Sequence, residues 1–219
     1  MRIINVNVGV FDENDRLAAE VRSRLEEQKT FMINLMASPG AGKTTLLVKT
    51  AETLKDMFKM GVMEADIDAS VDAETMEAAG VRSIQVHTGG ECAMDAAMTL
   101  QAIHEFDTSD LDLLVLENVG NLVCPAETPV GAHKNVVLLS VPEGDDKPLK
   151  YPLMFSVADL VIITKVDTEG FFAFDHEALV ERVKERNPRA EVIFLSAKTG
   201  EGMAAWTEWL KREIGSFRG

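Results

Sequence analysis

The sequence has 219 residues, 22 of them basic and 36 acidic, for a formal net charge of −14. This length suits one well-buried domain and is short for two independent ones. The negative charge argues against a sequence-independent contact with a nucleic-acid backbone or an anionic membrane surface, so we expect neither partner. No apolar run reaches the roughly 20 residues that cross a bilayer, and the first residues lack a secretory signal pattern, so we expect a cytoplasmic protein.

Near the amino terminus, Leu17, Val21 and Leu25 recur at four-residue spacing among charged residues, which predicts an amphipathic helix packed on the domain. Pro, Gly and charged residues exclude a long regular element from 142–152. Helical patterns lie at 44–59, 92–105, 176–186 and 202–213. Short apolar runs, each typical of a strand covered on both faces, lie at 31–36, 61–66, 83–88, 111–117, 135–140, 160–165 and 191–196.

This alternation predicts the α/β class, with a mostly parallel sheet flanked by helices on both faces. We expect a single domain over residues 1–219, with a helical extension over about residues 1–29. Open sheets of this kind collect ligand groups at the carboxyl ends of their strands. The motifs that follow the apolar runs are therefore the first candidates for function.

The stretch MASPGAGKTTLL, residues 36–47, follows the first expected strand and opens a helix, as a phosphate-binding P-loop requires. Glycines leave the backbone N–H groups accessible to phosphate oxygens, and the positive end of the helix dipole adds to the attraction. Lys43 is expected to reach the terminal phosphates, and the Thr44 hydroxyl is placed to bind Mg²⁺. The expected nucleotide contacts of this loop are Gly40, Ala41, Gly42, Lys43, Thr44 and Thr45.

One position departs from the strict P-loop pattern, because Ala37 stands where the pattern has its first glycine. A small residue there is sterically mild. The alternative interpretation is a chance glycine-rich turn between a strand and a helix. The strand, the loop, the Lys-Thr pair and the helix are all in register, which favours the P-loop.

Two later motifs predict the base. A carboxylate at Asp167, in ITKVD, can accept hydrogen bonds from both N1–H and the exocyclic amine of guanine, whereas adenine has an acceptor at N1. The motif FLSAKTGEG follows the next expected strand, where the backbone of Ser196, Ala197 and Lys198 can meet the guanine carbonyl. Each motif alone also fits an ordinary polar loop. Together with Lys165, and in this order after a P-loop, they favour GTP over ATP.

The magnesium end of the site is expected to use Glu117, at the end of an expected strand, while Gly120 leaves room for the γ-phosphate. A second carboxylate is expected from Asp66, Asp68 or Asp72. The first two lie nearest a strand end, and Asp72 is placed to swing in as a switch. One Mg²⁺ held by phosphates and a hydroxyl needs only one or two protein carboxylates.

The chain has two cysteines, Cys92 and Cys124, and in a reducing compartment they are poor disulfide candidates. Free thiols, buried apolar side chains and metal ligands all stay open as interpretations. Two thiolates are too few for a closed tetrahedral site, but a two-fold dimer that joined both pairs would supply four. Four thiolates suit Zn²⁺ and also square-planar Ni²⁺, so the sequence does not choose the metal.

The chain contains seven successive motifs, NLMASPGAGKTTLL, DIDASVDAE, TGGECAMDA, ENVGNLVCPAE, SVPEGDDKPLKYP, ITKVD and SAKTGEGM. In these motifs it resembles the HypB family, the GTPases of [NiFe]-hydrogenase maturation. The resemblance covers nearly the whole chain. It implies a SIMIBI-class GTPase that forms a GTP-dependent homodimer, works with a HypA-type metallochaperone and assists nickel delivery to the precursor of the hydrogenase large subunit.

The resemblance also implies roles for particular residues. Cys92 and Cys124 match the two thiolate positions of a family Ni²⁺ or Zn²⁺ site near the dimer interface. Asp72 and Glu117 match the acids near Mg²⁺, and together with Lys43 they form the expected catalytic set.

Two further departures concern metal ligands. Ala93 and Ala97 stand where the family usually has histidines, so imidazole ligation is lost. The chain also lacks the cysteine-rich amino-terminal nickel motif and the histidine-rich tract of some members.

A mechanistic hypothesis follows from the spacing of Glu117 and Cys124, which lie seven residues apart. A rearrangement on loss of the γ-phosphate can pass along this short path, so nucleotide state would set thiolate geometry and metal affinity. No histidine or arginine is obviously placed to activate water, so we expect slow intrinsic turnover.

Other functions stay open. One is a related nickel-delivery GTPase for another client such as urease; the NLVCP and DDKPLKYP motifs favour the hydrogenase type. Another is a nucleotide-gated adaptor without a metal role. Lys147 or Lys150 can reach a partner subunit's nucleotide, or can belong to a solvated loop.

Overall fold

The computed structural model describes residues 8–66, 76 and 79–219, and in this part of the chain seven strands form one sheet. Every neighbouring pair is parallel, in the order β3-β2-β4-β1-β5-β6-β7. Each strand coincides with one of the apolar runs, so the predicted fold class is confirmed. The strands are β1 (Phe31–Ala37), β2 (Met60–Asp66), β3 (Arg82–His87), β4 (Leu113–Glu117), β5 (Lys134–Ser140), β6 (Leu160–Thr164) and β7 (Glu191–Phe194).

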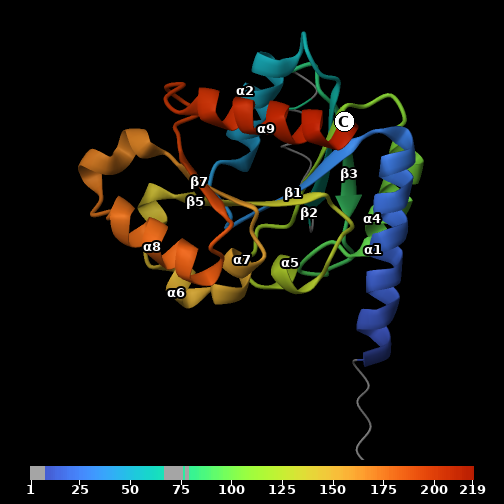
Figure 1. The fold of residues 1–219 in the computed structure, drawn as a ribbon, viewed down its shortest axis with the longest axis horizontal. Helices are drawn as coiled ribbons and strands as arrows, with labels where there is room; N and C mark the ends of the chain where they lie inside the picture. The colour runs from blue at the N-terminus through green and yellow to red at the C-terminus, as the bar shows by residue number, and fades with distance from the viewer. Residues whose placement is uncertain (1–7, 67–75, 77–78) are drawn as a thin grey trace, which may run out of the picture.

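Helices cover both faces of this sheet (Figure 1). The segment 142–152, from which a long element was excluded, contains only short helices. The helices are α1 (Val8–Gln28), α2 (Lys43–Leu54), α4 (Ala96–Phe106), α5 (Cys124–Glu127), α6 (Lys147–Lys150), α7 (Pro152–Ser156), α8 (His176–Arg186) and α9 (Met203–Arg218), with 3-10 helices η1 (Val141–Glu143) and η2 (Val166–Phe171).

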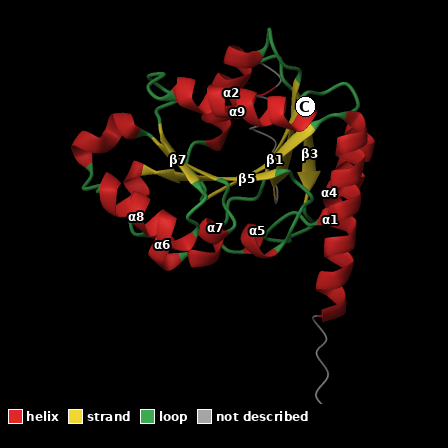
Figure 2. Ribbon diagram, in the orientation of Figure 1, coloured by secondary structure: helices red, strands yellow, loops and turns green. Residues whose placement is uncertain are grey.

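The helices form distinct layers (Figures 1 and 2). Helices α2 and α9 lie on one face of the sheet, and Trp206 of α9 donates a hydrogen bond to Thr50 of α2 inside the core between them. Helices α5, α6, α7 and α8 lie across the opposite face beneath β5, β6 and β7. Helix α1 packs along α4 at the β3 side of the sheet.

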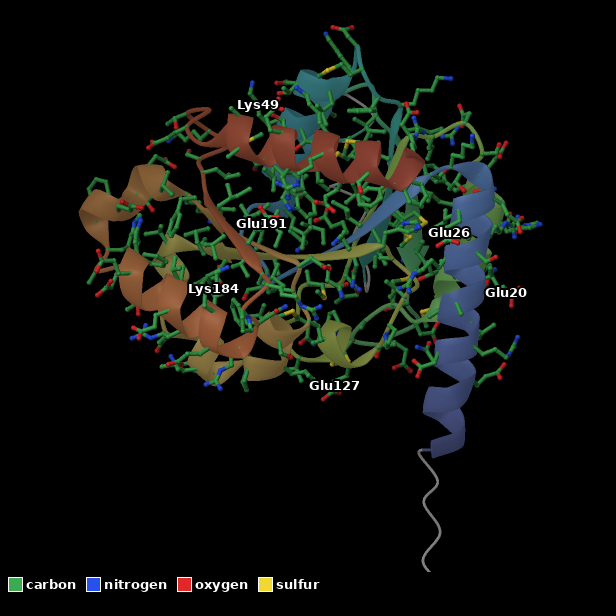
Figure 3. All side chains as sticks on the ribbon, in the orientation of Figure 1. Glu20, Glu26, Lys49, Glu127, Lys184 and Glu191 are labelled. Atoms are coloured by element: carbon green, nitrogen blue, oxygen red, sulfur yellow. A yellow bond between two sulfur atoms is a disulfide. The ribbon has the colours of Figure 1, made fainter. Side chains whose placement is uncertain are left out.

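The amphipathic pattern of the amino-terminal helix has the expected orientation. Val21 and Leu25 of α1 are fully buried in the core that they share with α4 and β4. The acidic side chains Glu20 and Glu26 lie on the solvent side of the same helix (Figure 3). Within the described residues, none of the helices has the length and apolar character that a membrane span needs.

Three helix ends differ from those predicted, and one of them is the end of α9, at Arg218 rather than at residue 213. Helix α4 begins at Ala96 rather than at residue 92, because the Asp95 carboxylate caps it by accepting a hydrogen bond from the Met98 N–H at 2.7 Å. Helix α2 ends at Leu54 rather than at residue 59. Residues 92–95 are therefore a loop that lies at the carboxyl end of β3, which places Cys92 in a loop.

Candidate nucleotide-binding site

The predicted P-loop forms the turn between the central strand β1 and helix α2. Gly40 and Gly42 have positive φ angles of 75° and 100°, which favour glycine, and Gly42 caps the helix that begins at Lys43. A side chain at Gly40 would project into open space. Ala37, the departure from the strict pattern, is a fully buried residue of β1, so it stands inside the sheet. The backbone N–H groups at the start of α2 are thus presented to an anion.

A cavity of about 720 Å³ opens over this loop. Gly120 lies in the loop that follows β4 and allows that loop to approach the P-loop, because a side chain there would come within 2.9 Å of the Pro39 ring. Lys43 Nζ lies 3.8 Å from Glu117 Oε1, and both side chains are almost fully buried. The structure therefore brings together the expected Lys43, Thr44, Glu117 and Gly120. The lining residues are Pro39, Gly40, Gly42, Lys43, Thr44, Thr45, Glu64, Ala65, Glu117, Asn118, Val119, Gly120 and Lys165.

A second cavity of about 340 Å³ adjoins the first, and both are lined by Gly42, Thr45 and Lys165. It contains the expected base-recognition groups. The Ser196 hydroxyl donates a hydrogen bond to Asp167 Oδ1 at 2.6 Å and accepts one from the Thr199 N–H at 3.2 Å, which fixes the carboxylate. The lining residues are Ala41, Gly42, Thr45, Thr164, Lys165, Asp167, Thr168, Ser196, Ala197 and Lys198.

Two hydrogen bonds join the P-loop to the base-recognition loop. Thr164 Oγ1 donates to the Ala41 carbonyl and Lys165 Nζ donates to the Gly40 carbonyl, each at 2.6 Å. Thr164 was not among the predicted site residues, since its role requires β6 to lie near the P-loop in space. Its signal in the sequence was a hydroxyl at the end of an otherwise apolar strand. Lys165 has a left-handed backbone at φ 60°, which turns its side chain toward the P-loop.

The three candidate carboxylates for Mg²⁺ fall at the edge of what the structure describes. Asp68 and Asp72 lie outside the described residues, and only the backbone of Asp66 is described, as the end of β2. A carboxylate that was not predicted, Glu64 of β2, lines the phosphate cavity and is buried. The sequence signal for it was a charged residue inside an apolar strand.

The two cysteines require a correction. The structure joins Cys92 and Cys124 in a disulfide with their Cα atoms 6.0 Å apart, although we expected the pair to be a poor disulfide candidate. That expectation rested on the redox compartment, whereas the fold decides proximity. The loops that follow β3 and β4 emerge at the same edge of the sheet, and they bring together cysteines 32 residues apart. A disulfide sulfur is not a thiolate, so metal ligation by this pair requires its reduction.

The metal prediction for this pair stays a prediction. The described part of the chain has no group of three or more His, Cys, Asp or Glu residues arranged to hold a metal ion. Beside its disulfide partner, Cys124 Sγ has a polar contact with an amide, because Asn121 Nδ2 donates to it at 3.3 Å. Each chain contributes two sulfurs, so a two-fold dimer that brought both pairs together would supply four.

Comparison with known proteins identifies the family. Residues 31–194 match the family described as CobW/HypB/UreG, nucleotide-binding domain. The hydrogenase maturation factor HypB of Azotobacter chroococcum mcd 1 is 44% identical over 215 residues, which cover 98% of this chain and 70% of that protein. The chain belongs to the HypB family. The resemblance predicted from the motifs is confirmed.

Two other members of the HypB family bear on function. The hydrogenase/urease maturation factor HypB of Helicobacter hepaticus is 40% identical over 208 residues, which cover 93% of this chain and 85% of that protein. The crystal structure of HypB from Helicobacter pylori in complex with nickel is 38% identical, with a TM-score of 0.87 over 93% of this chain and 96% of that one. Membership of the HypB family makes this chain a P-loop GTPase of hydrogenase maturation.

Proposed function

We propose that this chain binds and hydrolyses GTP and uses the cycle to assist nickel insertion into [NiFe]-hydrogenase. The observation that carries the proposal is the pair of adjoining cavities. One has the P-loop, Lys43 and Glu117, and the other has Asp167 held by Ser196. A guanine nucleoside triphosphate would place its phosphates in the first cavity and its base in the second, which share Gly42, Thr45 and Lys165.

The residues that line the two cavities have separate roles in the proposed reaction. The N–H groups of residues 40–45 bind the phosphates, and the Lys43 ammonium moves from Glu117 to the terminal phosphate. The backbone of Ser196, Ala197 and Lys198 contacts the guanine carbonyl, while Asp167 accepts from N1–H and the amine. Since no histidine or arginine among the described residues lines either cavity, we expect slow turnover.

The residues of the phosphate cavity also fit Mg²⁺. Thr44, Glu64 and Glu117 all line one cavity beside the P-loop, and their side chains have the hard oxygen atoms that Mg²⁺ prefers. We propose that Thr44 and Glu117 hold the ion, with Asp72 as a third group. Bound there, Mg²⁺ would neutralise charge on the phosphates.

The metal cargo is proposed to bind at the reduced cysteines. Cys92 and Cys124, as thiolates, would take Ni²⁺ or Zn²⁺, and a GTP-dependent homodimer would bring two such pairs together. The proposed partners are a HypA-type metallochaperone and the precursor of the hydrogenase large subunit. The name of the Helicobacter hepaticus relative supports urease as a second client. A nucleotide-gated adaptor without a metal role stays the alternative.

The test is calorimetry on the reduced protein. We expect GTP and GDP to bind in the presence of Mg²⁺ and ATP to bind far more weakly, and Ni²⁺ or Zn²⁺ affinity to differ between the two nucleotide states. Absence of heat with GTP and Mg²⁺ would end the GTPase proposal. Nucleotide binding without any metal binding would favour the adaptor.

A further inference from the structure

Glu64 and Glu117 lie side by side on neighbouring strands. They are Cα register partners across β2 and β4, which run about 4.8 Å apart. Two positions earlier, Val62 and Val115 belong to the core beneath α2 and α9. Because side chains alternate along a strand, both carboxylates lie on the α2 face of the sheet, where Lys43 starts the helix.

Both carboxylates are also buried in the phosphate cavity. Glu64 is 5% exposed and Glu117 is 6% exposed, and both line the cavity above the P-loop. Among the described residues, the cations of that lining are Lys43, 3.8 Å from Glu117, and Lys165, whose ammonium donates a hydrogen bond to the Gly40 carbonyl. A triphosphate adds several negative charges to a buried place that already contains two carboxylates. Low dielectric strengthens this repulsion, so a further cation is needed for tight binding.

We propose that Glu64 makes nucleotide binding at this site depend on Mg²⁺. Its charge weakens binding of the free nucleotide and strengthens binding of the magnesium-loaded one, so the two ligands are coupled through it. This role requires the charge of Glu64 and no direct bond to the ion. The inference rests on the proposed GTP site and deepens it, since Glu64 becomes the group that selects the magnesium complex.

The experiment measures nucleotide affinity rather than turnover. GTP and GDP dissociation constants are determined for the full chain with excess Mg²⁺ and with a chelator, and their ratio gives the coupling. We expect Glu64→Gln to lower this ratio about tenfold or more, by strengthening binding without Mg²⁺ and weakening it with Mg²⁺. Glu213→Gln removes an equally charged group that pairs with Lys134 at the amino end of β5, and it should leave the ratio unchanged.

Two further variants separate charge from shape. Glu64→Asp keeps the charge and should retain most of the wild-type ratio; a fall equal to that of Glu64→Gln would overturn the inference. Gln85 is the register partner of Glu64 on β3, so Gln85→Glu adds a charge to the same row and should raise the ratio. This second variant decides the matter if Glu64→Gln does not fold, which thermal unfolding reports.

The outcomes also distinguish this inference from the proposed function. If the wild-type protein binds GTP and Glu64→Gln shows the wild-type ratio, the role of Glu64 is wrong and the GTP site stands. An unchanged ratio in Gln85→Glu would have the same meaning. If the wild-type protein binds no GTP with Mg²⁺, the GTP site and the role of Glu64 are both wrong.

Discussion

Asn118 Oδ1 accepts a hydrogen bond from the Met94 N–H at 3.1 Å. Asn118 directly follows Glu117, and Met94 lies two residues after Cys92, so one buried amide joins the phosphate cavity to the cysteine loop. Asn118 Nδ2 also donates to Asn34 Oδ1 of β1 at 3.0 Å, which anchors the amide in the sheet. This through-space connection is shorter than the covalent path from Glu117 to Cys124.

Replacing this amide should loosen the cysteine loop. Asn118→Ala leaves the buried Met94 N–H without its acceptor, and we expect the free energy of unfolding to fall by about 1–3 kcal/mol. We also expect the alkylation rate of the reduced cysteines to depend less on whether GDP or a GTP analogue is bound. Denaturant unfolding and timed alkylation measure the two effects.

Asn14→Ala is the matched control. Asn14 Oδ1 accepts from the Ala96 N–H at 3.0 Å, so its loss destabilises the start of α4 while leaving the phosphate cavity intact. We expect this variant to lose stability and to keep the nucleotide effect on alkylation. A nucleotide effect in Asn118→Ala equal to that of wild type would show that coupling does not run through this amide.

The sequence predicted the strands closely because burial on both faces produces apolar runs that local reading can detect. The pairing of Glu64 with Glu117 could not be predicted that way, since it depends on β4 lying beside β2 in the sheet order. The P-loop and the base-recognition motifs could be predicted from the sequence because each is a local pattern at a strand end.

Three features were predicted wrongly or missed, one for a local reason and two because they depend on long-range contacts. The start of α4 was misplaced because residues 92–95 continue its helical apolar pattern, although the Asp95 cap was present in the sequence. The disulfide was missed because proximity of Cys92 and Cys124 arises from two loops at one sheet edge. Thr164 was missed because its bond to Ala41 joins residues 123 positions apart.

Reduction should control metal binding. The described structure has no free cysteine, so the oxidised protein should react with no thiol reagent and the reduced protein should react twice per chain. We expect Ni²⁺ or Zn²⁺ to bind tightly only after treatment with a dithiol reductant that is then removed under anaerobic conditions. The variant with both Cys92→Ser and Cys124→Ser should bind weakly in either state; an affinity equal to that of reduced wild type would exclude the sulfurs as ligands.

Lys43 should be required for binding the terminal phosphate. Charge-assisted hydrogen bonds contribute about 1.5–3 kcal/mol, so Lys43→Ala should weaken GTP binding about 10–100-fold and GDP binding less. Lys49, on the exposed side of the same helix, pairs with Glu52 and provides the control Lys49→Ala (Figure 3). Equal GTP affinities in the two variants would remove Lys43 from the site.

Asp167 should decide the base. Asp167→Asn replaces an acceptor by an amide donor, which opposes the exocyclic amine of guanine and suits the corresponding carbonyl of xanthine. We expect GTP binding to weaken about 10–100-fold and XTP binding to strengthen. Glu169→Gln changes a carboxylate in the same loop that contacts His176 at 2.7 Å, and it should leave base preference unchanged. If Asp167→Asn leaves the GTP:XTP preference unaltered, Asp167 does not contact the base.

His133 should make the free energy of unfolding depend on pH. The centroid of its ring lies 5.4 Å from that of the Phe31 ring and 4.5 Å from that of the Phe217 ring. Burial, together with the charge of Arg22, lowers its pKa from 6.5 to about 4. Nδ1 accepts a hydrogen bond from the Met32 N–H, which fits a neutral ring. The unfolded chain therefore takes up a proton near pH 6.5, and the folded protein does so only near pH 4.

The stabilising contribution is thus complete above pH 6.5 and is lost as the pH falls toward 4. Because the ring is only partly buried, we expect a loss of about 1–3 kcal/mol over that interval, less than the full pKa difference would give. His133→Asn retains an acceptor for Met32 and removes the titration, so its unfolding free energy should vary less with pH between those limits. His104→Asn, on the exposed side of α4, should follow the wild-type dependence. A pH dependence in His133→Asn as steep as that of wild type would assign the acid sensitivity to other groups.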